Sequence, residues 1–264
     1  MGVQTEISLE RLNLLFPSYS FTSLFPTKDG IIDTTYIVAN NTTTYILKKY
    51  EREIKDKVEK NSKLLSKLYN KSLNVPLFLA ESQGWYLYTK LEGSQPKHIQ
   101  IYHLHSLARF MLKLHQTTSY KDCHHPFISQ KTLKIRLEYL KRNYYFYYKK
   151  FQSIKNYKEG CNTLIHGDIF RDNTLFEGRK IAVFDFIDAG CGSVSFDIAV
   201  ALLSFKRKRV THYFIDSFLK VYNQKNRRKI AREDIEESIK VAIAFYTLLR
   251  IYKYKNIRRV KELL

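Results

Sequence analysis

The chain has 264 residues, of which 44% are hydrophobic, and this is enough for a sizeable core in one large domain or two modest ones. With nine glycines and five prolines it cannot be collagenous or low-complexity, and without a long apolar run or a signal-peptide pattern it is expected to be cytoplasmic. The net charge of +20 would suit a polyanionic partner if the basic residues clustered. They are abundant throughout, which favours solvated faces and makes nucleic acid an unlikely partner.

The first predicted element is a short helix, because Ser8 is a good N-cap ahead of apolar residues at helical spacing. β-branched and aromatic residues then predict two strands, joined by a turn at Asn40-Asn41. The strands cover 34–40 and 42–50, a helix follows at about 52–71, and two further strands cover 75–82 and 84–93. These elements form a small antiparallel sheet with one main helix.

Helical patterns dominate after Gly93. Residues 99–116 place apolar side chains three and four positions apart, which indicates an amphipathic helix. Further helices are predicted over 130–150, 195–205, 210–223 and 232–252. We therefore predict an α+β chain with a small lobe over residues 1–92, a hinge at about 89–96, and a larger, mostly helical lobe over 93–264.

The cysteines Cys123, Cys161 and Cys191 are widely spaced and form no CxxC pair. Such spacing signals neither a disulfide framework nor a zinc site. We expect three free thiols.

The stretch HGDIFRDNTLFEGRKIAVFDF, residues 166–186, concentrates acidic and amide side chains in a basic chain. A strand over 163–165 delivers Asp168 into a tight loop, and a hairpin brings Asn173 and Asp185 close together. A carboxylate and an amide oxygen are ligands that Mg²⁺ takes, while Asp168 is left to accept a proton from a hydroxyl. This division of roles fits phosphoryl transfer better than the capping of turns.

HGDIFRDN and the later DF resemble the catalytic and metal segments of the aminoglycoside phosphotransferase and choline kinase superfamily, which is related to the protein kinases. The resemblance implies a protein-kinase-like two-lobed fold that uses ATP and Mg²⁺. It makes Asp168 the catalytic base and Asn173 and Asp185 the metal ligands. It also assigns support of the catalytic loop to His166 and Asp197.

The same resemblance implies nucleotide contacts in the first lobe. In YILKK, Lys48 is the candidate for the nucleotide phosphates, with Lys49 as a rival, and Glu59 is expected to pair with it, with Glu53 as the alternative. KDGIIDTTYIV corresponds to the phosphate-covering loop and LYTKLEG to the hinge that meets adenine. The further candidates are Gly30, Thr34 and Thr35 in that loop, Lys90 and Glu92 in the hinge, and Arg171 and Asp188 for phosphate or substrate contact.

Within the superfamily, the chain is most similar to the homoserine kinase subfamily. The likeness lies in MGVQTEISLERLNLLF, GIIDTTYIVANNTTTYILKKYE and HGDIFRDNTLFEG, and it implies homoserine as the small-molecule acceptor. Gly167, the Lys48-Lys49 pair and DAGCGSVSFDIA depart from that subfamily. Choline, ethanolamine, an amino sugar or an aminoglycoside therefore remain alternative acceptors, and an inactive kinase fold or a nucleic-acid-binding protein is a more distant alternative.

Overall fold

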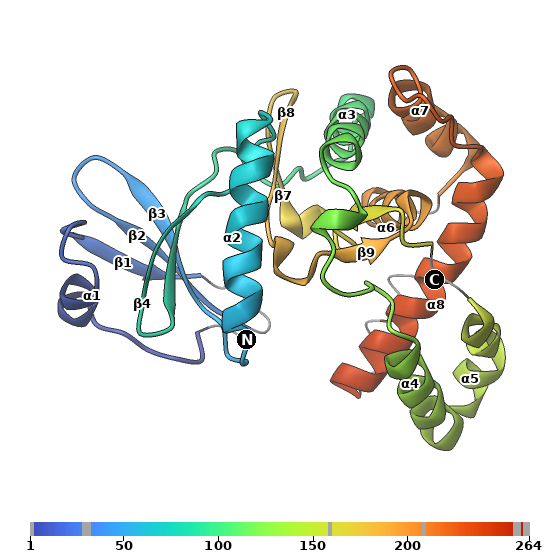
Figure 1. Cartoon of the computed structure of the whole chain (residues 1–264), viewed down its shortest axis with the longest axis horizontal. Coiled ribbons are helices and arrows are strands. Elements are labelled where there is room, and N and C mark those ends of the chain that lie inside the picture. The colour runs from blue at the N-terminus through green and yellow to red at the C-terminus, as the bar shows by residue number, and fades with distance from the viewer. Residues whose placement is uncertain (1–2, 28–32, 158–159, 207–209, 256–259, 261–264) are drawn as a thin grey trace. The chain divides into compact units, whose positions relative to one another are not determined.

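The computed structural model describes residues 3–27, 33–157, 160–206, 210–255 and 260 (Figure 1). It divides the chain into two compact units, one of Met1–Gly93 with Ala182–Ile187 and one of Ser94–Ile181 with Asp188–Leu264. The prediction assigned everything beyond residue 92 to the second lobe. Residues 182–187 instead belong to the first unit, where the N–H of Val183 donates a hydrogen bond to the carbonyl of Asn74 at 3.0 Å.

The first unit is built on an antiparallel five-stranded sheet with the strand order β1-β2-β3-β5-β4. The strands are β1 (Ser23–Pro26), β2 (Thr34–Ala39), β3 (Thr44–Lys49), β4 (Phe78–Ser82) and β5 (Trp85–Thr89). Sequence reasoning did not predict β1, which is short, ends in proline and lies at the edge of the sheet. Proline is tolerated there because an edge strand leaves some N–H groups unpaired.

A short helix and a longer one accompany this sheet, and Figure 1 shows them on opposite sides of the strands. In α1 (Leu9–Leu15), the Ser8 hydroxyl accepts a hydrogen bond from the N–H of Arg11, as expected for an N-cap. Leu12 of α1 is fully buried and packs in one core with Leu47 and Leu87 of the sheet. The second helix, α2 (Lys55–Asn70), buries one face made of Val58, Asn61, Leu65 and Leu68.

The second unit is mostly helical. Its helices are α3 (Ile101–Thr117), α4 (Gln130–Asn143), α5 (Tyr145–Phe151), α6 (Val194–Phe205), α7 (His212–Tyr222) and α8 (Arg232–Tyr254). The helix predicted over 130–150 is interrupted at Tyr144, which has the non-helical angles φ −144° and ψ 58°. The longest helix, α8, packs against α4 and α6. In the described part of the chain, no helix combines the length and the apolar character needed to cross a bilayer.

Short strands position the segment that carries the acids of the sequence pattern. Strand β6 (Thr163–Ile165) pairs antiparallel with β9 (Gly190–Gly192), which the sequence did not predict. Strands β7 (Thr174–Glu177) and β8 (Lys180–Val183) form the expected hairpin, and its turn contains Gly178 with φ 56°. The end of β6 therefore leads directly into the loop at 166–168.

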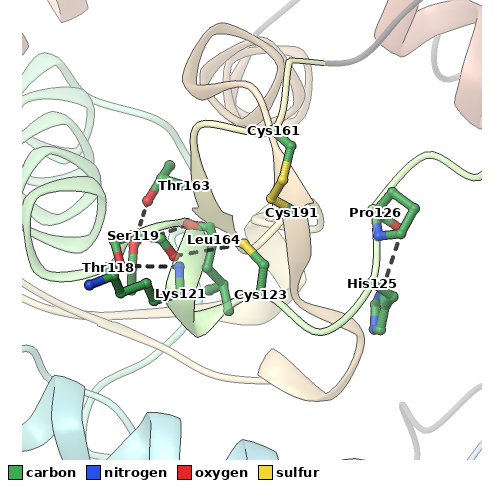
Figure 2. The surroundings of a disulfide bond; sticks show 10 residues. All are labelled: Thr118, Ser119, Lys121, Cys123, His125, Pro126, Cys161, Thr163, Leu164 and Cys191. Atoms are coloured by element: carbon green, nitrogen blue, oxygen red, sulfur yellow. Dashed lines mark hydrogen bonds between the residues drawn. A yellow bond between two sulfur atoms is a disulfide. The ribbon is translucent and has the colours of Figure 1, made fainter.

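The expectation of three free thiols is wrong for two of the cysteines. Cys161 and Cys191 are joined by a disulfide, with their Cα atoms 5.1 Å apart (Figure 2). Pairing of β6 with β9 explains this, because Leu164 lies opposite Cys191 and Cys161 lies just before β6. Cys123 keeps a free thiol and is half-buried.

Candidate active site

The loop after β6 turns at Gly167, which has φ +74°. A Cβ atom at this position would run into the ring of Phe127, so that glycine is required both by the backbone angle and by the space available. The buried carboxylate of Asp197 accepts hydrogen bonds from the backbone N–H groups of His166 at 3.2 Å and Gly167 at 2.7 Å. These bonds fix the backbone just before Asp168.

A buried polar chain supports Asp197 from two helices. Nε2 of His115, on α3, lies 3.0 Å from Asp197 Oδ2, and Nδ1 of His115 lies 2.9 Å from the hydroxyl of Tyr222, on α7. Burial, together with the charge of Asp197, raises the pKa of Tyr222, which therefore keeps its proton. The catalytic-loop candidate is thus connected to α3 and α7 as well as to α6.

Asp168 is half-buried and held by neighbouring donors. Nδ2 of Asn173 donates to the Asp168 carbonyl at 2.8 Å and to Oδ2 at 3.2 Å. The hydroxyl of Tyr246, on α8, lies 3.2 Å from Oδ1 and also within hydrogen-bond distance of the Gly167 carbonyl. Nδ1 of His166 accepts from the Asp168 N–H at 3.2 Å. Each carboxylate oxygen therefore has a donor that sets its orientation.

Tyr246 is suited to donate rather than accept here. Burial raises its pKa well above the ordinary value, and the adjacent Asp168 charge raises it further. The hydroxyl carries one hydrogen, which Gly167 and Asp168 must share. Because its pKa is raised, Tyr246 remains neutral. Its hydroxyl contacts both the Gly167 carbonyl and the Asp168 carboxylate and so fixes the turn and the carboxylate.

In the first unit, Asp185 follows β8 with φ 70°, an angle that residues other than glycine rarely adopt. Its Oδ1 lies 3.0 Å from Nζ of Lys48, on β3. A strained backbone of this kind costs about 1–3 kcal/mol and is common at functional sites. The local fold therefore presents the Asp185 carboxylate to Lys48 at an energetic cost.

YILKK contains two lysines, and Lys48 is the one that contacts the carboxylate of Asp185. Burial by itself would lower the pKa of its ammonium group, but the charge and hydrogen bond of Asp185 outweigh burial and raise it. Lys48 therefore stays positively charged at neutral pH. Lys49 instead places its ammonium 5.3 Å from the ring centroid of Trp85.

The predicted pair of Lys48 and Glu59 is not found. Oε1 of Glu59 lies 2.7 Å from Nζ of Lys63, and the Glu59 side chain is 72% exposed. The reason is the rotation of α2, whose buried face carries Val58 and Asn61 and leaves position 59 in solvent. Glu53, the alternative, precedes the helix and is also exposed. Asp185 takes the place that the prediction gave to a glutamate.

The predicted phosphate-covering loop is only partly described, since Gly30 lies outside the described residues. The buried hydroxyl of Thr34 accepts hydrogen bonds from the N–H groups of Gln4 and Thr5 and donates to Glu51 at 2.6 Å. The carbonyl of Thr35 accepts from the N–H of Thr27 at 3.0 Å. The Thr34 side chain is therefore used within the fold.

The remaining candidates lie at the edges of these clusters. Lys90 and Glu92 follow β5 and form a long ion pair of 3.9 Å. Arg171 opens the 3₁₀ turn Arg171–Asn173, is exposed, and donates its backbone N–H to the Ser204 hydroxyl at 2.6 Å. Asp188 ends the 3₁₀ turn Phe186–Asp188 and is half-buried. Two further 3₁₀ turns cover Tyr120–Asp122 and Gln152–Asn156.

Sequence reasoning missed Tyr246 and Phe127, which shape the Asp168 loop. Tyr246 is 78 residues from Asp168 in the chain. Neither Tyr246 nor Phe127 belongs to a recognisable motif. An aromatic residue on a helix normally indicates a core position. Only the packing of α8 and of the segment before α4 reveals their contacts with the loop.

Asp185 and Asn173 offer the oxygen ligands that suit Mg²⁺. The nitrogen of the Asn173 amide is engaged by Asp168, so the amide oxygen is the atom that remains for a cation. A carboxylate and an amide oxygen are hard donors and leave further positions for phosphate oxygens and water. Each of the two residues therefore offers, within its own unit, a donor of the kind that Mg²⁺ takes.

Solved structures share this fold. A macrolide 2'-phosphotransferase from Brachybacterium faecium matches with a TM-score of 0.72 and 15% identity over 97% of this chain and 96% of that chain. A choline kinase from Streptococcus pneumoniae matches with a TM-score of 0.69 and 13% identity over 96% of this chain and 94% of that chain. The fold is protein-kinase-like, with an antiparallel β unit followed by a mostly helical unit.

The sequence comparisons are more specific. A homoserine kinase from Janthinobacterium sp. (strain Marseille) is 23% identical over 228 residues, which cover 76% of this chain and 71% of that protein. The model of the phosphotransferase enzyme family, APH, matches residues 26–232, well over half of the chain. The matched range contains both the Lys48–Asp185 pair and the Asp168 loop. The chain therefore belongs to the phosphotransferase enzyme family.

Proposed function

We propose that the protein is an ATP-dependent kinase that transfers the γ-phosphoryl group to the hydroxyl of a small molecule. The observation that carries this proposal is the carboxylate of Asp168, which is oriented through both oxygens at the end of a fixed turn. A carboxylate placed in this way suits the acceptance of a proton from an attacking hydroxyl. Family membership supports phosphoryl transfer as the reaction.

In this proposal, Lys48 binds nucleotide phosphates with its positive charge, and Asp185 and Asn173 hold Mg²⁺. The metal, when bound, neutralises negative charge on the phosphoryl group that is transferred. Backbone groups near Thr35 and at residues 90–92 are assigned to the phosphates and to adenine. These assignments rest on the resemblance of the motifs, and those of Lys48 and Asp185 are also supported by their ion pair.

The chemical step is assigned to Asp168. As the acceptor oxygen attacks the γ-phosphorus in line, the bond to the bridging oxygen breaks and ADP leaves, while the hydroxyl proton passes to the carboxylate. Asn173 and Tyr246 keep this carboxylate oriented during the reaction. Asp197 and His166 hold the turn that presents it.

We infer that the acceptor is homoserine, for which the sequence likeness to a homoserine kinase is one support. A second support is Arg136 of α4, whose Nε and Nη1 atoms are buried and find no hydrogen-bond partner among the described residues. Its guanidinium lies 5.3 Å from the ring centroid of Phe245, next to Tyr246 in α8. Two buried side-chain nitrogens without partners are costly unless an acceptor group pairs with them.

The electrostatic setting of Arg136 favours an acceptor that carries a carboxylate. Burial lowers the pKa of the guanidinium, and the hydroxyls of Tyr252 and Tyr246 partly oppose this. The ring over which Arg136 lies belongs to Phe245, the neighbour in α8 of Tyr246, and Tyr246 contacts Asp168. Arginine binds carboxylates through paired hydrogen bonds, whereas it repels cationic acceptors such as choline or an aminoglycoside.

The test is a measurement of ADP release with homoserine, choline, ethanolamine, amino sugars and aminoglycosides as acceptors. We expect the highest kcat/KM for homoserine. The variant Arg136→Gln should raise the KM for homoserine by about 10–100-fold, because a charge-assisted hydrogen bond contributes about 1.5–3 kcal/mol. The KM for ATP should stay unchanged.

A matched control separates the carboxylate from the rest of the acceptor. 2-Amino-1,4-butanediol lacks the carboxylate of homoserine, so Arg136→Gln should leave its already high KM unaltered. A preference for choline, or an equal effect of the variant on both acceptors, would contradict the assignment of homoserine. ADP release with none of the acceptors would contradict the kinase assignment itself.

A further inference from the structure

All three cysteines of the chain come together in the second unit, although they lie far apart in the sequence. Their sulfur atoms lie within 4.8 Å of one another. Figure 2 shows the sulfur of Cys123 beside the disulfide formed by Cys161 and Cys191. The chain has three cysteines, and the convergence of all three at one place needs a structural explanation.

The backbone holds the three segments in place without the disulfide. The N–H of Cys191 donates to the carbonyl of His125 at 2.8 Å, and the Cys191 carbonyl accepts from the N–H of Phe127 at 2.8 Å. On its other side, β9 pairs with β6, so that Cys191 lies opposite Leu164. These bonds would keep the three sulfurs near one another in the reduced protein.

From this arrangement we propose that the reduced protein binds a thiophilic cation of the Zn²⁺ class through Cys123, Cys161 and Cys191, and that the disulfide is the oxidised form of the same site. In a tetrahedral zinc site each Zn–S bond is about 2.3 Å, which places sulfur atoms about 3.8 Å apart. The observed convergence within 4.8 Å is compatible with this spacing after small side-chain rotations.

The burial of the three residues suits entry of an ion from one side. Cys191 is buried, Cys123 is half-buried and Cys161 is exposed. Cys161 can therefore rotate away from Cys191 toward solvent once the disulfide opens, and water can occupy the fourth position. A site with three protein ligands and one exchangeable position is a common arrangement for zinc.

The two forms are related by a balanced exchange. A soluble dithiol transfers two electrons to the S–S bond of Cys161 and Cys191, which breaks to give two thiols, while the dithiol closes to its own disulfide. Binding of the cation then releases thiol protons to solvent. Oxidation by a low-molecular-weight disulfide reverses the first step and removes two of the three ligands.

The experiment uses the full chain, reduced with a dithiol, freed of reductant without oxygen, and titrated with Cd²⁺ as the probe. The thiolate-to-cadmium charge-transfer absorbance counts sulfur ligands, and competition with a chelator gives the affinity. We expect one ion per chain with three thiolates. Oxidised protein should give no such band.

Two variants make the test specific. Cys123→Ser leaves both disulfide cysteines in place, and Cys161→Ser changes an exposed position, so both should fold, as circular dichroism will check. Each should weaken Cd²⁺ binding by more than about 100-fold, because loss of an outer partner of a ligand alone costs about 10–100-fold. Equal affinity of Cys123→Ser and the reduced wild type, fewer than three thiolates per ion, a disulfide that resists the dithiol, or no binding would each overturn the proposal.

Discussion

Asp185 in the first unit and Asp168 in the second both follow short strands, but their carboxylates are held in different ways. Asp185 has a left-handed backbone conformation and forms an ion pair with Lys48 at 3.0 Å. Asp168 follows a left-handed glycine and accepts hydrogen bonds from the neutral side chains of Asn173 and Tyr246. The ion pair with Lys48 holds the first carboxylate, and hydrogen bonds from two neutral side chains help to orient the second.

The difference suggests different chemistry at the two carboxylates. A carboxylate beside a lysine is kept ionised and suits a metal ligand near phosphates. A carboxylate oriented by neutral donors can accept a proton without first losing a cationic partner from those bonds. Each of the following variants separates the two sites, and the largest effect is given first.

Asp168→Ala should lower kcat by about 10³-fold or more, since a general base contributes about 10²–10⁴-fold and its orientation is lost as well. The affinity for ATP with Mg²⁺ should change little, because the nucleotide contacts are assigned elsewhere. Steady-state kinetics and calorimetric titration with a non-hydrolysable ATP analogue measure the two quantities. Full activity of the purified variant would remove Asp168 from the mechanism.

Asp185→Ala should act on binding instead. It removes a metal ligand and the ion-pair partner of Lys48, so nucleotide affinity in the presence of Mg²⁺ should fall by about 100-fold or more. Nucleotide binding measured with a chelator in place of Mg²⁺ serves as the control and should differ much less between the variant and the wild type. If Mg²⁺ still raises the nucleotide affinity of Asp185→Ala as much as that of the wild type, Asp185 is not a metal ligand.

Gly167→Ala should destabilise the turn of the Asp168 loop by about 2–4 kcal/mol, from steric overlap with the Phe127 ring and an unfavourable φ. The temperature of thermal unfolding and kcat should both decrease. The matched variant is Gly178→Ala, because Gly178 also has positive φ but an added Cβ meets no atom within 4 Å. Equal losses in the two variants would mean that the contact with Phe127 is unimportant.

Tyr246→Phe should give the smallest effect. Removal of one hydroxyl hydrogen bond costs about 1 kcal/mol and should reduce kcat by about 10-fold or less, with the KM for ATP unchanged. The matched variant Tyr213→Phe alters a tyrosine of α7 that is 75% exposed and should leave kcat unaltered. Identical kcat values for the wild type and Tyr246→Phe would show that neutral donors on Asp168 do not position the base.

Several local features were predictable because they depend on residues that are close together in the sequence. The Ser8 cap, the strands around the YILKK motif and the β7–β8 hairpin follow from neighbouring residues. Strand β1 was not predicted, since four residues ending in proline carry little pattern of their own. It exists because β2 provides a partner edge, which is a tertiary condition.

The candidate site shows the same division. The spacing from His166 to Asn173 identified the loop, and the structure brings these residues together with Asp197. The glutamate proposed for Lys48 was misplaced, because the rotation of α2 about its axis decides which side chains face the sheet. Spacing along the chain cannot determine that rotation to within one residue.

The sequence by itself determined the fold class, the family and the loop that carries Asp168, because short motifs and hydrophobic periodicity report local structure directly. Tertiary structure decided that Lys48 meets Asp185, that Tyr246 contacts Asp168, and that three distant cysteines share one place. These contacts join residues that lie between 30 and 137 positions apart in the chain. They arise from the packing of whole helices and strands, which no single segment encodes.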